Sequence, residues 1–145
     1  MRIRPYRDPD QAAVVALWRA CGLTRPWNDP ASDIAHCLKS REAALLVGED
    51  AGGRVVASVM VGQDGHRGWM YYVAVDPDRQ KSGYGRALVA AAEAWHNARG
   101  VPKSMLLVRA ENARVIAFYR ALGYEVEERV LMTRWLKTPP APPGP

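Results

Sequence analysis

The chain contains 145 residues, of which 48% are hydrophobic and 24% are charged, a composition typical of globular domains. A domain of this length buries roughly two thirds of its unfolded surface, so it needs no disulfide or structural metal. This excludes disordered and fibrous proteins, and no apolar run reaches the ~20 residues that a membrane span requires. Met1–Arg7 leads into no apolar run, which predicts a cytoplasmic protein without a signal peptide.

The net charge is +5, from 20 Lys and Arg against 15 Asp and Glu, and it favours an anionic ligand. The basic residues are scattered and no helix-turn-helix or RNA-binding signature is present, which argues against a nucleic-acid-binding domain. Cys21 and Cys37 form no C-x-x-C motif, and the three histidines share no ligand spacing with them. We therefore expect neither a disulfide nor a metal site.

The first part of the chain is predicted to hold a short strand and two helices. The strand covers Arg2–Pro5. A helix capped by Asp8 follows and ends at Gly22, and a loop leads to a second helix capped by Asp29. Each cap is followed by a proline, which is typical of the first helical position.

Three apolar segments in the centre are predicted to be strands. They cover Ala43–Glu49, Arg54–Gly62 and Trp69–Val75. The turns between them are short, polar and rich in glycine, so we expect neighbouring strands to run antiparallel.

The second half alternates helices and strands. A glycine-containing turn leads to a long helix, Tyr84–Arg99, and then to an apolar strand, Ser104–Arg109. This crossover predicts that the strand lies parallel to Trp69–Val75. A last helix, Ala113–Leu122, precedes the strand-like segment Tyr124–Leu136.

Together these elements predict one α/β (α+β) domain over residues 1–137. We expect a mixed sheet of six to seven strands, antiparallel in the first half with a parallel pair later, flanked by about four helices. Trp18, Trp95 and Trp135 are interpreted as core residues. Residues 138–145 include five prolines and predict a disordered tail.

The turn before the long helix is the segment most informative about function. Gly83 and Gly85 lie at the helix start, with Arg79, Lys81 and Arg86 around them. The first turn of a helix has unpaired N–H groups and a partial positive charge, and glycine lets the backbone approach a ligand. Such a turn favours a phosphate site, although it has neither the Walker nor the Rossmann spacing. The alternative is a helix start with solvated basic residues.

Two motifs in this region resemble a known enzyme family. Gln80-x-x-Gly83-x-Gly85 resembles the [RQ]-x-x-G-x-[GA] pyrophosphate signature of the GCN5-related N-acetyltransferases, the GNAT superfamily. Val73–Pro77 resembles the strand that precedes this loop in the family. Asn112–Tyr124 resembles its segment N-x-x-A-x-x-[FL]-Y-x-x-x-G-[FY].

The resemblance implies a GNAT-like fold and an acyltransferase that carries an acetyl group from acetyl-CoA to a primary amine. The acceptor would be a small molecule or a peptide or protein N-terminus, attacked directly in a ternary complex. Residues 23–34 and 64–68 also look like the small bacterial YpeA-type acetyltransferases. The alternative is a CoA- or acyl-CoA-binding regulatory module without turnover. A homodimer that pairs the C-terminal strand-like segments is also compatible with the resemblance.

The resemblance assigns roles to three groups of residues. Backbone N–H groups of the loop would bind the CoA pyrophosphate, the preceding strand would bind the pantetheine arm, and the Val73 amide would donate to the thioester oxygen. Tyr119 would protonate the departing thiolate, or else it is a core aromatic. The cofactor-binding residues would be Val73, Ala74, Val75, Gln80, Lys81, Ser82, Gly83, Tyr84, Gly85, Arg86, Asn112 and Tyr119.

A general base is the part of the family pattern that the sequence lacks. Trp69–Val73 contains no acidic residue. The triplet Leu107-Val108-Arg109 lacks the glutamate that ribosomal-protein acetyltransferases of the family carry there, so we do not expect ribosomal N-terminal acetylation. The substitutes to consider are Asp64, His66, Glu49, or a water held by Tyr71 or Tyr72.

Acceptor recognition is expected from the two N-terminal helices, their connecting loop and the central turn. Carboxylates beside an indole can hold a cationic amine. The alternative is that Asp29 only caps its helix and Asp33 only complements the helix dipole. The candidate acceptor residues are Trp27, Asn28, Asp29, Asp33, Asp64, His66 and Tyr71.

Overall fold

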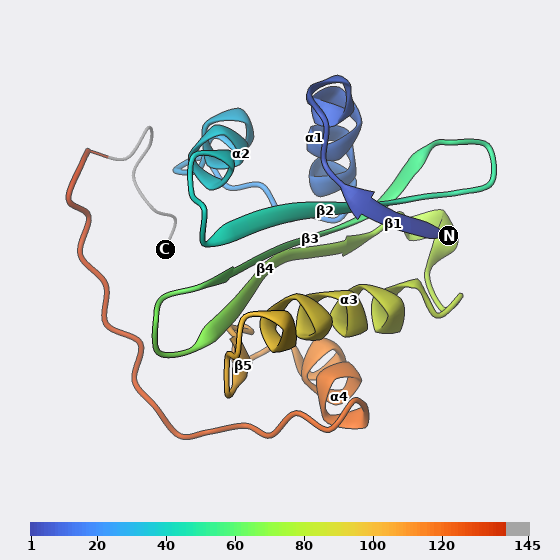
Figure 1. The fold of residues 1–145 in the computed structure, drawn as a ribbon. Coiled ribbons are helices and arrows are strands. Elements are labelled where there is room, and N and C mark those ends of the chain that lie inside the picture. Colours follow the sequence, from blue (N-terminus) through green and yellow to red (C-terminus); the bar gives the residue numbers. More distant parts are fainter. Residues whose placement is uncertain (139–145) are drawn as a thin grey trace.

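The computed structural model describes residues 1–138, and its strands form one mixed sheet (Figure 1). Strands β1 to β4 pair antiparallel with their neighbours, and β5 pairs parallel to β4, as the sequence predicts. The strands, in both chain and spatial order, are β1 (Arg2–Pro5), β2 (Ala43–Glu49), β3 (Val55–Gln63), β4 (Gly68–Val75) and β5 (Ser104–Leu106).

Helices cover both faces of this sheet. In Figure 1, α1 and α2 lie above it, α3 lies below it, and α4 lies beneath α3 and β5. Within residues 1–138 no helix is long and apolar enough to cross a membrane. The helices are α1 (Gln11–Ala20), α2 (Pro30–Leu38), α3 (Tyr84–Ala98) and α4 (Ala113–Ala121), with 3-10 turns at Asp8–Asp10 and Pro77–Arg79.

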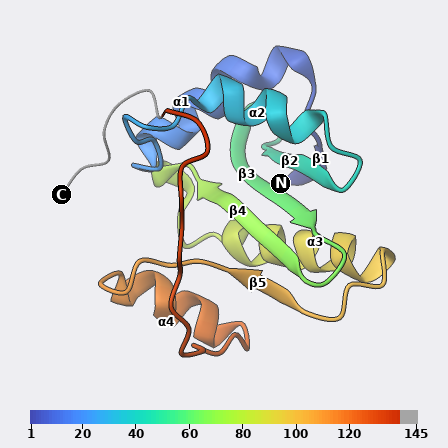
Figure 2. The ribbon, with the colours of Figure 1, turned by 90° about the vertical axis from the view of Figure 1, so that its left-hand side faces the viewer.

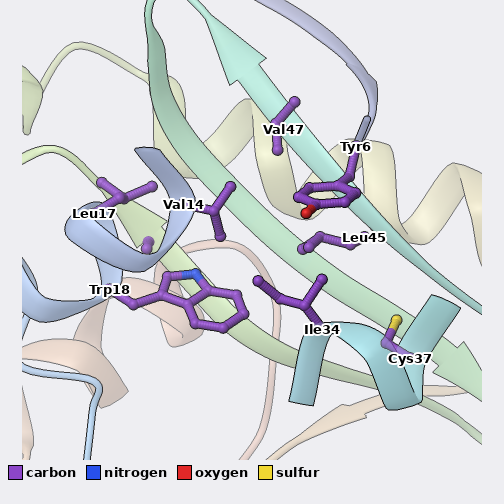
Figure 3. Close-up of a cluster of buried hydrophobic side chains, with 9 residues drawn as sticks. Tyr6, Val14, Leu17, Trp18, Ile34, Cys37, Leu45 and Val47 are labelled. Carbon is purple, nitrogen blue, oxygen red and sulfur yellow. The ribbon is translucent and has the colours of Figure 1, made fainter. Parts of the chain in front are cut away.

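The two faces of the sheet carry separate hydrophobic clusters. The upper cluster joins α1 and α2 to the sheet around the fully buried Trp18, and Figure 3 shows its side chains. The lower cluster joins α3 and Tyr119 of α4 to β3 and β4. Trp18 is therefore a core residue as expected, whereas Trp95 is only partly buried, with the Arg99 guanidinium 3.6 Å from its ring centroid.

The two predicted aspartate caps have different outcomes. Asp29 caps α2, because its Oδ1 accepts the N–H of Ala31 at 3.2 Å. Asp8 instead lies inside a 3-10 turn, and Asp10 is the residue that precedes α1. The buried Asp10 carboxylate accepts the backbone N–H of Arg7 at 2.8 Å and pairs with the Arg4 guanidinium, which ties the turn to β1.

The expected number of strands is wrong: residues 1–138 contain five strands, not six to seven. Tyr124–Leu136, predicted to be strand-like, has no regular secondary structure, and Ser104–Arg109 is a strand only to Leu106. Trp135, expected in the core, is 52% exposed. The physical reason is that a strand-like segment forms a strand only where a neighbouring strand supplies hydrogen bonds.

We name residues 125–138 the C-terminal arm. The arm leaves α4 and runs along the outside of the domain as one extended stretch (Figures 1 and 2). Its first half is tied to the body by an ion pair, with Lys103 Nζ 2.7 Å from Glu127 Oε2. The expected proline-rich tail at 138–145 lies, from residue 139 onward, outside the described residues.

Candidate active site

The parallel strands β4 and β5 separate soon after they begin. Their register holds only from Gly68 opposite Ser104 to Met70 opposite Leu106. The β4 strand continues to Val75, so in the described chain its outer edge has no strand partner beyond Met70. Backbone groups on such an edge are free to bind an extended ligand as another strand would.

A β-bulge interrupts the other edge of β4 at the same level. Ser58 pairs with Ala74 and Met60 with Tyr71, so Tyr72 and Val73 together oppose the single residue between Ser58 and Met60. Tyr72 has φ 52°, a left-handed conformation that is an outlier for a bulky residue. Such strain costs about 1–3 kcal/mol and persists only where surrounding contacts impose it.

The glycine-containing loop follows the end of β4 and leads into α3. Lys81 and Gly83 both have left-handed backbones, at φ 64° and 86°, and Gly83 is the N-cap of α3. The first intrahelical bond runs from the Ala87 N–H to the Gly83 carbonyl at 3.1 Å. The N–H groups of Tyr84, Gly85 and Arg86 precede that bond and point out of the helix start.

Side-chain contacts hold this loop against the end of β4. Gln80 Nε2 donates to the Val75 carbonyl at 3.4 Å, and the Ser82 hydroxyl donates to the Arg79 carbonyl. Arg79 is not the mobile cation that its position suggested, because its guanidinium is 2.9 Å from the Asp50 carboxylate in the β2–β3 turn. Lys81 and Arg86 remain exposed beside the loop.

Helix α4 borders the loop on its other side. Its N-cap is Asn112, whose Oδ1 accepts the N–H of Val115 at 3.3 Å, so the amide nitrogen of that side chain stays available as a donor. Tyr119 is 8% exposed and belongs to the same cluster that Val73 and Val75 contact. Burial raises the pKa of Tyr119 to about 12, so its hydroxyl is protonated at neutral pH.

The candidate acceptor residues of α2 and its preceding loop are placed unequally. Asp33 reaches β4, where its Oδ2 accepts the Tyr72 hydroxyl at 2.6 Å. Asp29 is exposed and bonded to its own helix, including the Ser32 hydroxyl at 2.8 Å. Trp27 and Asn28 are half-buried in the loop. The structure therefore brings one of the two carboxylates to the centre of the sheet.

The candidates in the β3–β4 turn lie at the opposite end of β4 from the loop (Figure 1). The Asp64 carboxylate accepts the N–H groups of His66 and Arg67 and the indole N–H of Trp69. These hydrogen bonds lower the pKa of Asp64 below its usual value, and the bond from the Arg67 N–H has the largest effect. Five residues of strand, or ~17 Å, separate Gly68 from Val73, so this turn is not brought to the bulge.

Two other residues considered for proton transfer differ in their surroundings. Glu49 forms ion pairs with Arg4 at 2.9 Å and with Arg2 at 3.1 Å. Both partners lower the pKa of Glu49, and Arg4 has the larger effect. Tyr71 is 48% exposed on β4, and burial of the rest of its ring raises its pKa. In the part of the chain that the structure describes, no cluster of three or more metal-ligating side chains is present.

Sequence reasoning missed the contacts behind the bulge. Trp18 was expected only to fill the core, but its indole N–H donates to the Ser58 hydroxyl at 2.9 Å. Ser58 is the single hydroxyl in a strand that is otherwise strongly apolar, and it is fully buried. That isolated polar side chain was the signal, because a buried hydroxyl requires a hydrogen-bond partner.

Comparison with known proteins identifies the family of the chain. Residues 10–124 match the model of the family described as "Acetyltransferase (GNAT) family". An acetyltransferase of Sodalis glossinidius is 46% identical over 132 residues, covering 91% of this chain and 92% of that protein. A protein of Yersinia pestis, described as an uncharacterized N-acetyltransferase, is 41% identical over 136 residues, which are 94% of this chain and 96% of that protein.

Solved structures share the fold at much lower identity. The aminoglycoside antibiotic 6′-N-acetyltransferase AAC(6′)-Ig of Acinetobacter haemolyticus superposes with a TM-score of 0.79 at 18% identity, covering 95% of this chain and all of that one. AAC(6′)-Iy in complex with a bisubstrate analogue, CoA-S-monomethyl-acetylneamine, has the same TM-score at 18% identity, covering 92% of this chain and 97% of that one. With the family match over residues 10–124, these findings establish that the chain is an acetyltransferase of the GNAT family.

Proposed function

We propose that this acetyltransferase transfers an acetyl group from acetyl-CoA to a primary amine, by direct attack in a ternary complex. One observation carries the proposal: a loop with left-handed residues at Lys81 and Gly83 opens α3 at the end of a strand whose outer edge is unpaired beyond Met70. The loop suits a pyrophosphate and the strand edge suits an extended arm with amide groups.

In this proposal the chain holds acetyl-CoA mainly through its backbone. The N–H groups of the loop and first helical turn, residues 81 to 86, bind the pyrophosphate, with the exposed Lys81 and Arg86 adding positive charge. Val73, Ala74 and Val75 bind the pantetheine arm through their backbone. The Asn112 amide nitrogen is a further donor to that arm, because its oxygen is already occupied by the cap of α4.

The chemical step would run as follows. The neutral amine attacks the thioester carbonyl carbon, and the oxygen of the resulting tetrahedral intermediate accepts the Val73 N–H. The carbon–sulfur bond then breaks, the thiolate takes the Tyr119 hydroxyl proton, the nitrogen loses its proton to water, and the Tyr119 phenolate regains a proton from water, which leaves the amide, the CoA thiol and the original enzyme. One oxyanion donor contributes about 2.7–4 kcal/mol. A thiol has a pKa of about 8.5, so its departure needs little assistance.

The acceptor in this proposal is an amine of low pKa. An α-amine of pKa about 8 is roughly one-tenth neutral at pH 7, whereas a lysine amine of pKa ~10.4 is neutral about once in 2,500 molecules. An α-amine of a peptide, or a small molecule with a comparable amine, therefore tolerates the missing base. Asp33 is the foremost acceptor contact because it reaches β4. Trp27, Asn28, Asp29 and Tyr71 are secondary contacts, and Asp64 and His66 are the weakest candidates.

We further propose that the chain is of the YpeA type, on the basis of the resemblance at residues 23–34 and 64–68.

We also propose that the chain forms a homodimer through the C-terminal arm. The arm exposes Val130, Met132 and Leu136 at 87–90%. A groove of about 680 Å³ lies beside β5, between the end of α3 and the start of the arm, and its lining includes Ser104 and Tyr124. An arm from a second copy that pairs along β5 would fill this groove and cover the apolar side chains.

The dimer is tested by light scattering of the full chain after size-exclusion chromatography. We expect a mass near twice the 16.0 kDa of the chain, and a monomer for the double variant Val130→Lys, Met132→Lys. These positions have no packing to lose in one chain, so unfolding does not confound the result. A monomeric wild-type protein at high micromolar concentration would contradict the proposal.

The acetyl-transfer proposal is tested first by thermal unfolding with acetyl-CoA, CoA or ATP. A ligand at 100 times its Kd stabilises the folded state by about 2.7 kcal/mol, which raises the Tm by several degrees. We expect a rise with acetyl-CoA and CoA but not with ATP. Release of free thiol would then be followed with a peptide α-amine, a polyamine and an aminoglycoside. No rise with either CoA ligand would overturn the loop assignment, and binding without thiol release would favour the regulatory alternative.

A further inference from the structure

Four side chains from four elements form a connected network behind the bulge of β4. The Trp18 indole of α1 donates to the Ser58 hydroxyl of β3 at 2.9 Å, and that hydroxyl donates to the Tyr72 carbonyl at 2.9 Å. The Tyr72 ring stacks on Trp18, with centroids 3.7 Å apart and planes 8° from parallel. The Tyr72 hydroxyl donates to Asp33 of α2 at 2.6 Å.

The network accounts for the unusual backbone of Tyr72. A bulge removes groups from the regular hydrogen-bond ladder, and the Ser58 hydroxyl supplies a partner for the Tyr72 carbonyl. The stacked ring and the bonded hydroxyl fix both ends of the side chain. Together these contacts impose a left-handed φ of 52° that a tyrosine otherwise avoids.

The bulge also changes which face of the sheet each β4 residue occupies. Met70 packs in the lower cluster with α3, but Tyr72 and Ala74 pack in the upper cluster with α1 and α2. In a regular strand, residues two apart share one face. The extra residue thus turns Val73 toward the lower cluster, which also contains Tyr119.

We propose that Trp18, Ser58, Asp33 and Tyr72 are positioning residues that hold the β4 bulge in the geometry that aims the Val73 N–H at the thioester oxygen. This inference rests on the proposed acetyl transfer. Trp18, Ser58 and Tyr72 touch none of the reacting atoms, and Asp33, which is also the foremost acceptor contact of the proposed function, acts as a positioning residue through its bond to the Tyr72 hydroxyl. They act through the Tyr72–Val73 peptide, whose direction is fixed when the Tyr72 side chain is fixed. A small misplacement of such a donor lowers the rate strongly, by up to about 100-fold for 1 Å.

The test compares Tyr72→Phe and Asp33→Ala, which remove the hydroxyl–carboxylate bond, with Asp33→Asn, whose amide oxygen still accepts it. Tyr6→Phe is the matched control, because Tyr6 is a buried tyrosine of the same cluster outside the network. The direct readout is the infrared carbonyl band of bound acetyl-CoA labelled with ¹³C at the thioester carbonyl. A hydrogen bond to that oxygen moves the band to lower frequency than in free acetyl-CoA.

We expect the low-frequency band in the wild type, Tyr6→Phe and Asp33→Asn, and its loss or reduction in Tyr72→Phe and Asp33→Ala. In Tyr72→Phe and Asp33→Ala the Kd for CoA should stay within about threefold of the wild-type value. Turnover with any active amine of the three-amine panel should fall at least about tenfold in Tyr72→Phe, which removes the hydroxyl–carboxylate bond but keeps the Asp33 carboxylate for the acceptor. A purely structural role would lower the Tm while leaving the band and the turnover of the folded protein unchanged, and that result would overturn the inference.

Two further outcomes separate this inference from the proposed function. If the wild-type protein does not bind acetyl-CoA, the proposed function fails and this inference fails with it. If the wild type binds and shows the low-frequency band, and the band persists in Tyr72→Phe and Asp33→Ala, only the positioning role is overturned. Ser58→Ala supplies an independent variant should Tyr72→Phe fail to fold, and it is expected to lose the band as well.

Discussion

A Cβ atom built on Gly85 would lie 3.0 Å from Cζ of Phe118, so α3 and α4 meet closely where the second glycine of the loop motif stands. Gly85 has an ordinary negative φ, whereas Gly83 has φ 86°. The two glycines therefore satisfy different requirements. Gly83 supplies a left-handed backbone, and Gly85 supplies space for a neighbouring ring.

We expect Gly85→Ala to affect stability differently with and without the Phe118 ring. Alanine favours a helix over glycine by about 0.8–1 kcal/mol, but overpacking against Phe118 costs about 1–3 kcal/mol. In the wild type the substitution should be neutral to destabilising, and in a Phe118→Ala background it should stabilise by roughly 0.5–1 kcal/mol. Urea unfolding of the four proteins measures this, and equal effects in both backgrounds would show that the contact is unimportant.

The same four proteins separate packing from ligand binding at Gly85. If only Phe118 requires a small residue there, the Kd for CoA in the Phe118→Ala background should be the same with glycine or alanine. If the pyrophosphate also approaches the Gly85 backbone closely, the alanine variant should bind CoA more weakly in that background too. Isothermal titration with CoA distinguishes the two cases.

Unlike Gly85, Gly83 is needed for its left-handed backbone and not for the space that it leaves. No atom lies within 4 Å of a Cβ built there, so only the positive φ opposes a side chain. We expect Gly83→Ala to destabilise by about 1–2 kcal/mol. Gly83→Asn should cost less, because asparagine tolerates this conformation and is a favourable N-cap. Equal losses for both variants in urea unfolding would refute this explanation.

The sequence predicted the order and direction of the strands because the relevant signals are local. Apolar runs, glycine-rich turns and proline-marked helix starts all act within a few residues, and Asp29 caps α2 as its pattern indicates. The bulge was not predictable, because Trp69–Val75 is apolar on both faces and hides the change of face at Tyr72. The contact of Tyr72 with Asp33 spans 39 positions and leaves no local signature.

The error at the C-terminal end has a different origin. Tyr124–Leu136 is predicted to be strand-like, but strand pairing depends on a partner that a single chain need not provide. The described chain supplies no strand beside this segment. Pattern reasoning thus predicts that a segment is able to form a strand, and tertiary structure decides whether it does.

The buried His96 of α3 packs directly against Gly68, the first residue of β4. Its ring is 2% exposed, with Nδ1 2.7 Å from the Ser104 hydroxyl and Nε2 3.0 Å from the Gly62 carbonyl. A Cβ on Gly68 would lie 2.4–2.6 Å from three atoms of that ring. We expect Gly68→Ala to destabilise by about 3 kcal/mol, at the upper end of overpacking costs.

The control for that prediction is Gly52→Ala in the exposed β2–β3 turn, where the nearest atom would lie 3.4 Å away. Its effect should stay within about 0.5 kcal/mol. Adding His96→Ala to Gly68→Ala should cost less than the sum of the single variants, because the ring that causes the clash is gone. Additive losses in urea unfolding would contradict the assigned contact.

Tyr119→Phe should separate binding from chemistry. Removing the hydroxyl keeps the buried ring and its edge contacts with Phe118 and Tyr124, so the Kd for CoA should change less than threefold. If the hydroxyl is the general acid, kcat should fall by about 10²-fold, the lower end of the usual range, because a thiolate is already a good leaving group. Stopped-assay thiol release with an active amine measures kcat, and an unchanged value would remove Tyr119 from the catalytic step.

The pH profile of the wild type carries a matching expectation. A tyrosine of ordinary pKa ~10 would lose half its protonated form at pH 10, but burial raises the pKa of Tyr119 to about 12. The general acid thus remains protonated across the measurable alkaline range. Activity should rise with pH as the acceptor amine loses its proton, and then level off without declining up to about pH 10. A decline near pH 9, present in the wild type and absent in the residual activity of Tyr119→Phe, would show that the hydroxyl titrates too early for this role.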